Sequence, residues 1–142
     1  MVNVDSEAAG HEGSNAIDGN PDTIWHTEWE RNAPKYPHEI TIKLHEQTEI
    51  KGLIYLPRQD MSNGWIAEYK VYLSEDGKNW GEPIASGKFQ KGRDNPQDAL
   101  RQKKITFGKP QKAKFIRFVA VSGFDGQIFA SVAELGVIPA SD

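Results

Sequence analysis

The stretch His38-Glu39-Ile40-Thr41-Ile42-Lys43-Leu44 alternates polar and apolar side chains along its whole length. Because successive side chains of a β-strand point to opposite faces, this alternation predicts a strand with one buried face and one face in water. Such one-sided strands are typical of antiparallel sheets. The stretch therefore indicates an antiparallel all-β domain.

Segments on both sides of this stretch also have the character of strands. Residues 50–56 form a nearly continuous apolar run, which predicts a buried strand, and Asn63-Gly64 then signals a turn. No segment has a convincing helical period. We expect further strands at 69–73, 105–107, 115–121 and 132–138, a short strand and loop within 2–14, Trp80 in the core, and a long surface loop over 87–101. Short strands separated by turns predict an all-β antiparallel β-sandwich of the jelly-roll type.

Length and composition limit the class of protein. The 142 residues suffice for one domain with a real core. A net charge of −3 and a pI of about 5.8 argue against a nucleic-acid-binding surface and disfavour an anionic membrane as partner. The chain has no cysteine, which excludes disulfides, thiolate catalysis and zinc–sulfur sites. No apolar run reaches the ~18 residues of a membrane span.

The sequence carries no recognisable catalytic motif. We find no Gly-x-Ser-x-Gly, no phosphate-binding Gly-x-x-x-x-Gly-Lys-Ser/Thr and no His-Glu-x-x-His. Carboxylates are numerous enough that counting alone leaves a general acid/base pair open. The start, Met1-Val-Asn-Val-Asp5, lacks the character of a signal peptide. We therefore expect residues 1–142 to be a single non-catalytic module, cut from a larger protein.

The stretch Asn15–Trp29 concentrates oxygen-bearing and aromatic side chains. Asp18, Asn20 and Asp22 alternate as in the first half of a calcium loop. The helix–loop–helix calcium motif then requires Gly at its sixth position and Glu at its twelfth, where this chain has Thr23 and Trp29. Two interpretations stay open: a non-helical calcium loop that uses carbonyls, Asp18 and the Thr23 hydroxyl, or an ordinary Asp-Gly-Asn-Pro turn.

Two loops combine aromatic rings with hydrogen-bonding side chains. His26 and Trp29 lie in one loop, and Arg58, Asn63 and Trp65 lie in another. An aromatic face can pack against the apolar patch of a pyranose while amide and guanidinium groups bind its hydroxyls. Turn formation and core packing explain the same residues one by one. From the residues alone, a sugar site and a purely structural role remain equally open.

Five blocks in order match the pattern of one family: residues 15–27 (Asn-Ala-Ile-Asp-Gly-Asn-Pro-Asp-Thr-Ile-Trp-His-Thr), Leu56-Pro-Arg-Gln-Asp60, residues 72–80 (Tyr-Leu-Ser-Glu-Asp-Gly-Lys-Asn-Trp), Phe115-Ile-Arg-Phe118 and Ala130-Ser-Val-Ala-Glu-Leu135. Across essentially its whole length the chain resembles the coagulation factor V/VIII type C (discoidin) domains. Within them it is most similar to family 32 carbohydrate-binding modules, such as those of bacterial sialidases and hexosaminidases and the N-terminal domain of galactose oxidase. The resemblance implies a discoidin-like β-sandwich with jelly-roll topology.

The resemblance also implies a structural Ca²⁺ that ties the first loop to the last strand. Seven oxygens would surround the ion, which suits the flexible coordination of calcium. They are the carbonyls of Asn15, Asn20 and Ala133, the carboxylates of Asp18 and Glu134, and both the carbonyl and the hydroxyl of Thr23.

The sugar site implied by the resemblance consists of six residues from separate parts of the chain. His26, Arg58 and Asn63 match the polar trio that reads the axial O4 of galactose or N-acetylgalactosamine. Trp29 and Phe129 match the aromatic residues, with Phe124 as a rival to the second. Glu12 matches an upstream acidic residue, with Glu7 as its rival.

We therefore expect a lectin-like, non-catalytic module. It would recognise terminal galactose, N-acetylgalactosamine, lactose or N-acetyllactosamine in a shallow loop site. It would bring a tethered glycoside hydrolase or galactose-oxidase-like enzyme to galactose-containing glycans, as a secreted or cell-surface protein and a monomer. One alternative is a structural accessory domain that packs on a catalytic domain without binding sugar. A lipid- or protein-binding discoidin domain is the third possibility.

Overall fold

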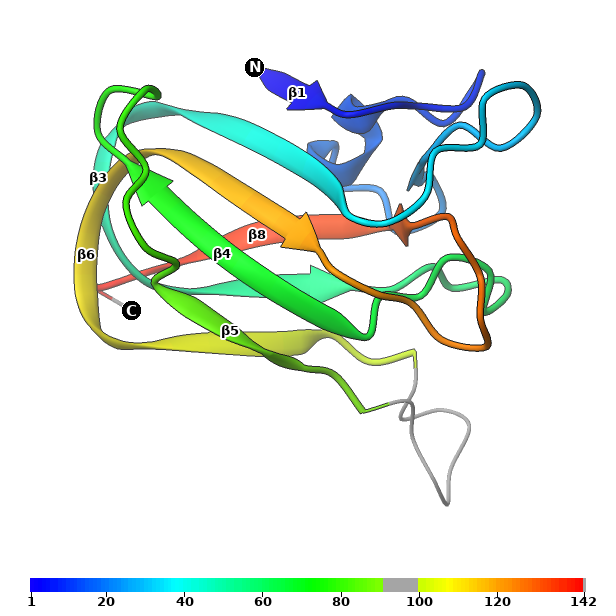
Figure 1. Cartoon of the computed structure of the whole chain (residues 1–142). Helices are drawn as coiled ribbons and strands as arrows, with labels where there is room; N and C mark the ends of the chain where they lie inside the picture. Colours follow the sequence, from blue (N-terminus) through cyan, green and yellow to red (C-terminus); the bar gives the residue numbers. More distant parts are fainter. Residues whose placement is uncertain (91–99, 142) are drawn as a thin grey trace.

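A computed structural model describes residues 1–90 and 100–141 of the chain, and nearly all of its regular structure is β (Figure 1). Within these residues no helix is long and apolar enough to cross a membrane. The elements in chain order are β1 (Val2–Val4), the 3₁₀ helix η1 (Gly13–Ile17), β2 (Trp25–His26), β3 (His38–Leu56), β4 (Glu68–Ser74), β5 (Ala85–Lys88), β6 (Lys103–Ala120), β7 (Ser131–Val132) and β8 (Glu134–Pro139).

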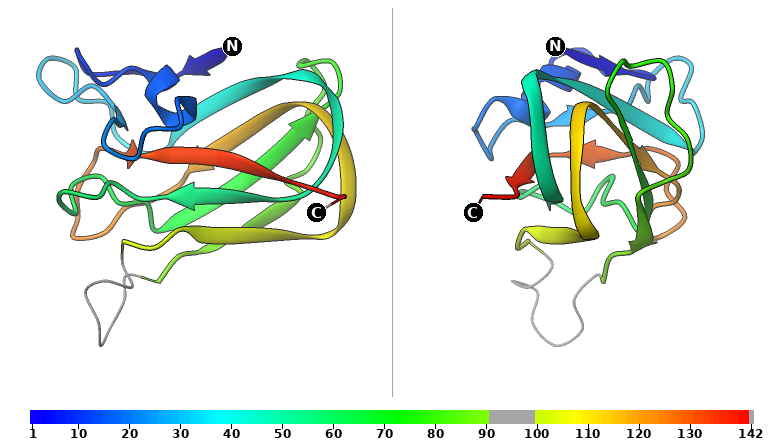
Figure 2. Two further views of the ribbon diagram at one scale, coloured as in Figure 1. Left: turned by 180° about the vertical axis from the view of Figure 1, so that it is seen from behind. Right: turned by 90° about the vertical axis from the view of Figure 1, so that its left-hand side faces the viewer.

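The strands form an antiparallel sandwich, which confirms the predicted fold class (Figures 1 and 2). The main sheet has the order β1-β3-β6-β4-β5, β8 adds to β3, and a separate short ribbon pairs β2 with β7. The first part of β3 pairs with the last part of β6, where Ile42 faces Ile116. The last part of β3 pairs with the first part of β6 and, on its other edge, with β8.

The two longest strands correct the sequence-based division into short strands. Residues 38–44 and 50–56 were expected as separate strands, but they are the two ends of β3. In the same way, 105–107 and 115–121 fall largely within β6. Both strands bend from one layer of the sandwich into the other (Figure 2), with register shifts in β3 between Lys43 and Thr48 and between Ile50 and Gly52. An irregularity in the ladder lets a strand bend without ending.

The core lies between the two layers and explains the alternation in the sequence. Ile40 and Phe118 from one layer are fully buried, as are Leu53 and Ile105 from the other. Burying a side chain of this size stabilises the fold by roughly 1.5–3 kcal/mol. Trp25 is also fully buried, and its indole N–H donates to the carbonyl oxygen of Ser6 at 2.9 Å. This residue fixes the first loop to the end of the sandwich.

Trp80 was expected in the core, and that prediction was wrong. Its ring is only half-buried and packs under the guanidinium group of Arg117, whose central carbon lies 4.2 Å from the ring centroid. The reason is the alternation of β6: Ile116 and Phe118 face inward, so Arg117 between them faces outward. Trp80 follows the turn around Gly77 onto this outer face. The expected surface loop over 87–101 falls mostly outside the described residues.

The ends of the chain also differ in detail from the prediction. The strand expected over 132–138 is divided at Ala133 into β7 and β8. The region expected as a short strand and loop contains β1 and part of η1. Four loops gather at one end of the sandwich, opposite the end of β8 (Figures 1 and 2). They comprise residues 5–12, 27–37, 57–67 and 121–130.

Candidate functional site

His26 is a buried polar residue at the loop end of the sandwich. It ends the short strand β2, where it pairs with Ser131 of β7. Its Nδ1 lies 2.6 Å from the carbonyl oxygen of Thr27, so Nδ1 donates its proton there. Burial lowers the pKa of His26 from its ordinary value, and the charge of Arg58 adds to this against the opposing effect of the Thr27 carbonyl. The neutral ring therefore offers Nε2 as a hydrogen-bond acceptor.

Aromatic side chains surround the His26 ring. The ring centroid of Phe129 lies 5.1 Å from that of His26, and that of Trp29 lies 6.5 Å away in an edge-on arrangement. Trp29 is 52% exposed, whereas His26 is 5% exposed. The exposed indole of Trp29 provides an apolar surface, and the buried imidazole of His26 beside it provides a polar group. This arrangement suits a flat ligand with one apolar face.

The loop that carries Phe129 is held by hydrogen bonds to its backbone. The Tyr36 hydroxyl donates to the carbonyl oxygen of Phe129 at 2.8 Å. The backbone N–H of Ala130 donates to the Thr27 hydroxyl at 3.0 Å. Phe124, the rival from the sequence, lines a separate small hollow with Trp65. Of the two phenylalanines, it is Phe129 that contacts His26.

Arg58 lies in the loop after β3, and its charge is among the influences that lower the pKa of His26. Its side chain is only 15% exposed, and its Nε donates to Asp60 Oδ1 at 2.7 Å. This hydrogen bond lowers the pKa of Asp60. The indole N–H of Trp65 donates to the carbonyl oxygen of Arg58 at 2.9 Å, which fixes the backbone on the other side. The guanidinium group is thus held in place by its own loop.

Asn63 lies in a turn that is fastened to the neighbouring strand. Its carbonyl oxygen accepts from the Ser131 hydroxyl at 2.7 Å, and its side chain belongs to an exposed residue. Gly64 follows with φ of +84°, and a Cβ there would lie within 2.8 Å of Ser131. Only glycine fits this close approach, which explains the Asn-Gly pair.

The acidic residue expected in the site does not join the cluster through any contact found in the described residues. Glu12 is exposed and stands at the N-cap of η1 without a side-chain capping bond. Its rival Glu7 accepts the backbone N–H of Gly13 at 2.7 Å. The carboxylate of Glu7 is therefore used to hold the first loop.

The sequence interpretation missed His11 as a residue of this region. Its ring centroid lies 6.3 Å from that of His26. The backbone explains the proximity, because His26 N–H donates to the carbonyl oxygen of His11 at 3.1 Å, and His11 N–H donates to that of Ala8 at 2.9 Å. A β-bridge between residues so close in sequence leaves no periodic pattern. Nothing in the sequence could have indicated it.

Several of the expected calcium residues gather around the turn that follows η1. Thr23 donates its hydroxyl hydrogen to the carboxylate of Asp18, and this bond is the main cause of the lowered pKa of Asp18. The Thr23 hydroxyl also lies 3.1 Å from the carbonyl oxygen of Asn20, and the side-chain amide of Asn15 donates to the carbonyl oxygen of Ile24 at 2.9 Å. The loop is therefore closed by its own polar groups.

Glu134 brings a second carboxylate to this loop from β8. Its Oε1 is buried and has no hydrogen-bond partner among the residues that the structure describes. Burial raises the pKa of Glu134 to about 7, and the neighbouring Asp18 adds to the effect. Buried carboxylate oxygens normally have a partner. The residues present thus fit an oxygen-binding cation such as Ca²⁺, with buried Ala133 beside them.

Comparisons with known proteins agree with one another. The sequence profile described as "F5/8 type C domain" matches residues 2–135. The chain is 43% identical to a galactose oxidase of Gibberella zeae over 99% of its own length and 20% of that protein. It is 42% identical to a sialidase of Micromonospora viridifaciens over 96% of its own length and 21% of that protein. The chain therefore spans about one fifth of the length of these relatives.

Solved structures give the same picture. The family 32 carbohydrate-binding module of Clostridium perfringens NanJ, in complex with galactose, superposes with a TM-score of 0.81 and 29% identity over 96% of this chain and 91% of that one. A second module from Clostridium perfringens, in complex with GalNAc-beta-1,3-galactose, has the same TM-score and 36% identity, over 97% of this chain and 94% of that one.

Proposed function

The chain belongs to the F5/8 type C domain family, and we propose that it binds terminal galactose-type sugars in the loop site around His26. At the coarser level it is a carbohydrate-binding module that has no catalytic role of its own, as the sequence predicted. The proposal concerns the sugar and the residues that read it. Galactose, N-acetylgalactosamine, lactose and N-acetyllactosamine are the ligands in question.

The observation that carries this proposal is a buried hydrogen-bond acceptor beside an exposed aromatic ring, since the ring centroids of His26 and Trp29 lie 6.5 Å apart. His26 Nε2 is available as an acceptor, because Nδ1 is committed to Thr27. The guanidinium group of Arg58 is close enough to influence the pKa of His26. A sugar hydroxyl can donate its hydrogen to His26 Nε2 and accept a hydrogen bond from the Arg58 guanidinium group at the same time. We assign this role to the axial O4, with Asn63 at a neighbouring hydroxyl; Glu12 would take part only if its exposed side chain turned toward the bound sugar.

The aromatic residues supply the apolar side of the site. Trp29 and Phe129 flank His26 from two loops, so the C–H face of a pyranose can pack against a ring while its hydroxyls face the His26 imidazole. At about 0.3–0.5 kcal/mol per heavy atom, a monosaccharide gains roughly 4–6 kcal/mol. The expected dissociation constant is roughly 0.05–1 mM. Such weak binding favours a tethered module with a high effective concentration.

We further propose that Ca²⁺ binds between the first loop and β8. Asp18, Thr23 and Glu134 would hold it with side-chain oxygens, and carbonyls of Asn15, Asn20 and Ala133 would complete the set. The unpartnered buried Oε1 of Glu134 supports this assignment. When bound, the ion would offset the negative charges of Asp18 and Glu134 and hold the first loop against β8. Its role is structural.

Removal of calcium should therefore lower the stability of the fold. At a free concentration one hundred times the dissociation constant, a ligand of the folded state contributes about 2.7 kcal/mol. We expect the melting temperature to fall by several degrees when a chelator replaces Ca²⁺, and Glu134→Gln to remove most of that difference. If neither the chelator nor added Ca²⁺ changes the melting temperature, the calcium assignment is refuted.

The partner and the location follow from the same proposal. The relatives include a galactose oxidase and a sialidase, of which this chain covers one fifth, so we propose a tethered catalytic domain in the parent protein. Glycans displayed outside the cell would then be the target, and a secreted or cell-surface location would follow. We propose a monomer, since one loop site needs no second copy.

The structural-domain alternative requires an apolar surface patch that a catalytic domain would cover. In the part of the chain that the structure describes, the exposed large apolar side chains are Met1, Ile17, Trp29, Met61 and Ile128. Three of them, Trp29, Met61 and Ile128, lie in the site loops. This distribution favours a ligand at the loop end over a docking patch elsewhere.

Isothermal titration with galactose and glucose tests the proposal. The two sugars differ at C4, so we expect saturable heat with galactose in Ca²⁺-containing buffer and little with glucose. Arg58→Ala should abolish the difference without changing the circular dichroism spectrum, and Lys70→Ala on the sheet is the matched control. Wild-type galactose binding by Arg58→Ala, or equal binding of both sugars, would refute the assignment.

A further inference from the structure

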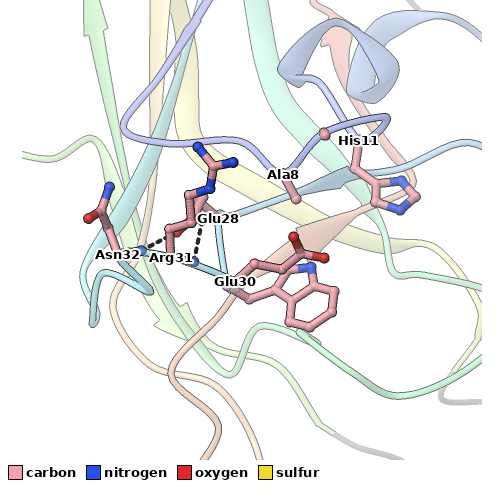
Figure 3. Close-up of a pocket in the computed structure, with 8 residues that line it drawn as sticks. Ala8, His11, Glu28, Glu30, Arg31 and Asn32 are labelled. Atoms are coloured by element: carbon pink, nitrogen blue, oxygen red, sulfur yellow. Dashed lines mark hydrogen bonds between the residues drawn. The ribbon is translucent and has the colours of Figure 1, made fainter.

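A hollow of about 580 Å³ lies beside the proposed galactose site, on the side of the first loop (Figure 3). Ala8, Ala9 and His11 form one wall, and residues 28–32 form the other. The volume is within the roughly 300–1,000 Å³ of small-molecule sites. We call this hollow, with these two walls, the side groove. The residue roles proposed above for the terminal sugar leave this hollow unassigned.

The side groove and the galactose site share two residues. His11 and Trp29 line the groove, and both rings also lie beside His26 at centroid distances of 6.3 and 6.5 Å. Because the indole of Trp29 is exposed, it can present a surface to both places. A ligand seated on His26 that continues past Trp29 or His11 therefore enters the side groove.

One wall of the groove is set before any ligand binds. The carboxylate of Glu28 accepts the backbone N–H groups of Arg31, Asn32 and Ala33 at 2.7, 2.8 and 2.9 Å (Figure 3 shows the first two). These bonds lower the pKa of Glu28 and hold the loop, including Ala33 at a φ of 39°. A pre-ordered wall loses little entropy when a ligand binds.

The opposite wall is also held by the backbone. The N–H of Ala8 donates to the carbonyl oxygen of His26 at 2.8 Å, and His11 is bonded to both Ala8 and His26. The two walls are thus joined through β2. Since their spacing is fixed by the same strand that carries His26, the groove keeps its position relative to the galactose site.

The side chains in the groove indicate an uncharged, hydroxyl-rich ligand. Asn32 brings an amide, and the exposed Glu30 and Arg31 bring one charge of each sign. Glu28 adds a second carboxylate, although its oxygens are already occupied by backbone donors. An acidic sugar would face two carboxylates against one guanidinium. A neutral sugar unit can use Glu30, Arg31 and Asn32 as hydrogen-bond partners.

We propose that the side groove is a second subsite, which takes the neutral sugar next to the terminal galactose in the same glycan chain. This rests on the proposed function, because it needs a galactose seated on His26. The terminal sugar supplies the recognition, and its neighbour adds contacts to Trp29, Arg31 and Asn32. The module therefore binds a disaccharide more tightly than a monosaccharide.

Titration calorimetry of the whole chain with galactose and with two neutral disaccharides that end in galactose, lactose and N-acetyllactosamine, tests the subsite. We expect at least one disaccharide to bind about fivefold to tenfold more tightly than galactose. In the double variant Arg31→Ala/Asn32→Ala this ratio should fall to about one. Lys35→Ala, exposed in the same loop but outside the groove, is the control and should keep the ratio. A disaccharide of galactose and glucuronic acid should gain less than the neutral ones.

The outcomes separate the two proposals. If no sugar binds, the galactose site itself is refuted. If galactose binds but neither disaccharide binds more tightly, or if the double variant keeps the full ratio, the second subsite is refuted while the galactose site stands. If the acidic disaccharide binds as much more tightly than galactose as the neutral ones do, the side groove has no preference for a neutral sugar.

Discussion

Two buried histidines near the loop end of the sandwich are used in opposite ways. His26 has one ring nitrogen bonded to a carbonyl, and its pKa is lowered. His38 has Nδ1 2.9 Å from Asp5 Oδ2 and Nε2 2.6 Å from the carbonyl oxygen of Ile128. Two acceptors around one ring require two donated protons, so His38 is an imidazolium. Burial lowers the pKa of His38, but the bonds to Asp5 and Ile128 and the charge of Asp5 outweigh it and raise the pKa overall.

The difference shows that burial alone does not identify a functional histidine. Both side chains are buried, yet only His26 keeps some exposure and a ring nitrogen without a protein partner among the contacts described. The groups that face His38 are the Asp5 carboxylate, the Tyr36 ring at 4.6 Å and the Ile128 carbonyl, with the more distant His26 as the other titratable group. His38 is therefore structural, and His26 is available for a ligand.

The largest expected effect is the loss of stability in His38→Ala. This change removes two charge-assisted hydrogen bonds and leaves the Asp5 carboxylate without its partner, which should cost about 3 kcal/mol in the free energy of unfolding. Urea denaturation measures it. His45→Ala, at an exposed position of β3, is the control and should change that free energy by less than about 0.5 kcal/mol. Equal losses in both variants would remove the distinction drawn for His38.

His26→Gln should separate binding from stability. The amide cannot reproduce both the Nδ1 bond to Thr27 and the acceptor at Nε2, so the galactose dissociation constant should rise at least about tenfold, or 1.4 kcal/mol. The free energy of unfolding should fall less than in His38→Ala. Calorimetry and urea denaturation of the same preparation give both values. Wild-type affinity in a folded His26→Gln protein would show that His26 is not the acceptor.

Tyr36→Phe should have a smaller effect, which reaches the site through the backbone. It removes the donor that holds the Phe129 carbonyl, a loss of about 1 kcal/mol in stability. Because Phe129 packs on His26, galactose affinity should fall by about twofold to fivefold as the loop loosens. The control is Tyr72→Phe in β4, a strand of the main sheet. Unchanged affinity together with reduced stability would restrict Tyr36 to a structural role.

The pH dependence of stability should carry the signature of His38. Its pKa is raised in the folded state, so its contribution is complete below about pH 6.5, the ordinary value, and is lost as the pH rises through the raised pKa. The free energy of unfolding of the wild type relative to His38→Gln should therefore decrease above pH 6.5. Urea denaturation at a series of pH values measures this difference. A difference that grows with pH would contradict an imidazolium at His38.

The sequence predicted the parts of the molecule that depend on local patterns. The alternation at Ile40 and Ile42 predicted the sandwich, and the turn around Asp18 could be recognised from adjacent residues. The role of His38 could not, because its partners lie 33 and 90 residues away along the chain. The bends of β3 and β6 were missed for a related reason. A bulge interrupts hydrogen bonding without interrupting the strand, so the pattern simply looks like two strands.

The candidate site divides in the same way. His26 and Trp29, three residues apart, could be predicted as neighbours from one loop. The choice between Phe129 and Phe124 depended on which backbone Tyr36 holds, and this is a long-range contact. His11 carried no signal, since its place is set by a backbone bridge. These positions are set by long-range hydrogen bonds to the main chain. Because the main chain of any residue type can accept such a bond, composition and spacing do not reveal it.

The continuity of β3 and β6 through both layers has a consequence for how the molecule comes apart. In a sandwich of separate short strands, one layer can open while the other survives. Here each of the two central strands belongs to both layers, so opening either layer strains the ladder of the other. We expect a single cooperative unfolding transition and uniformly slow amide exchange along β3 and β6. The four loops at the end of the sandwich would then move on a pair of sheets that is either fully folded or fully unfolded.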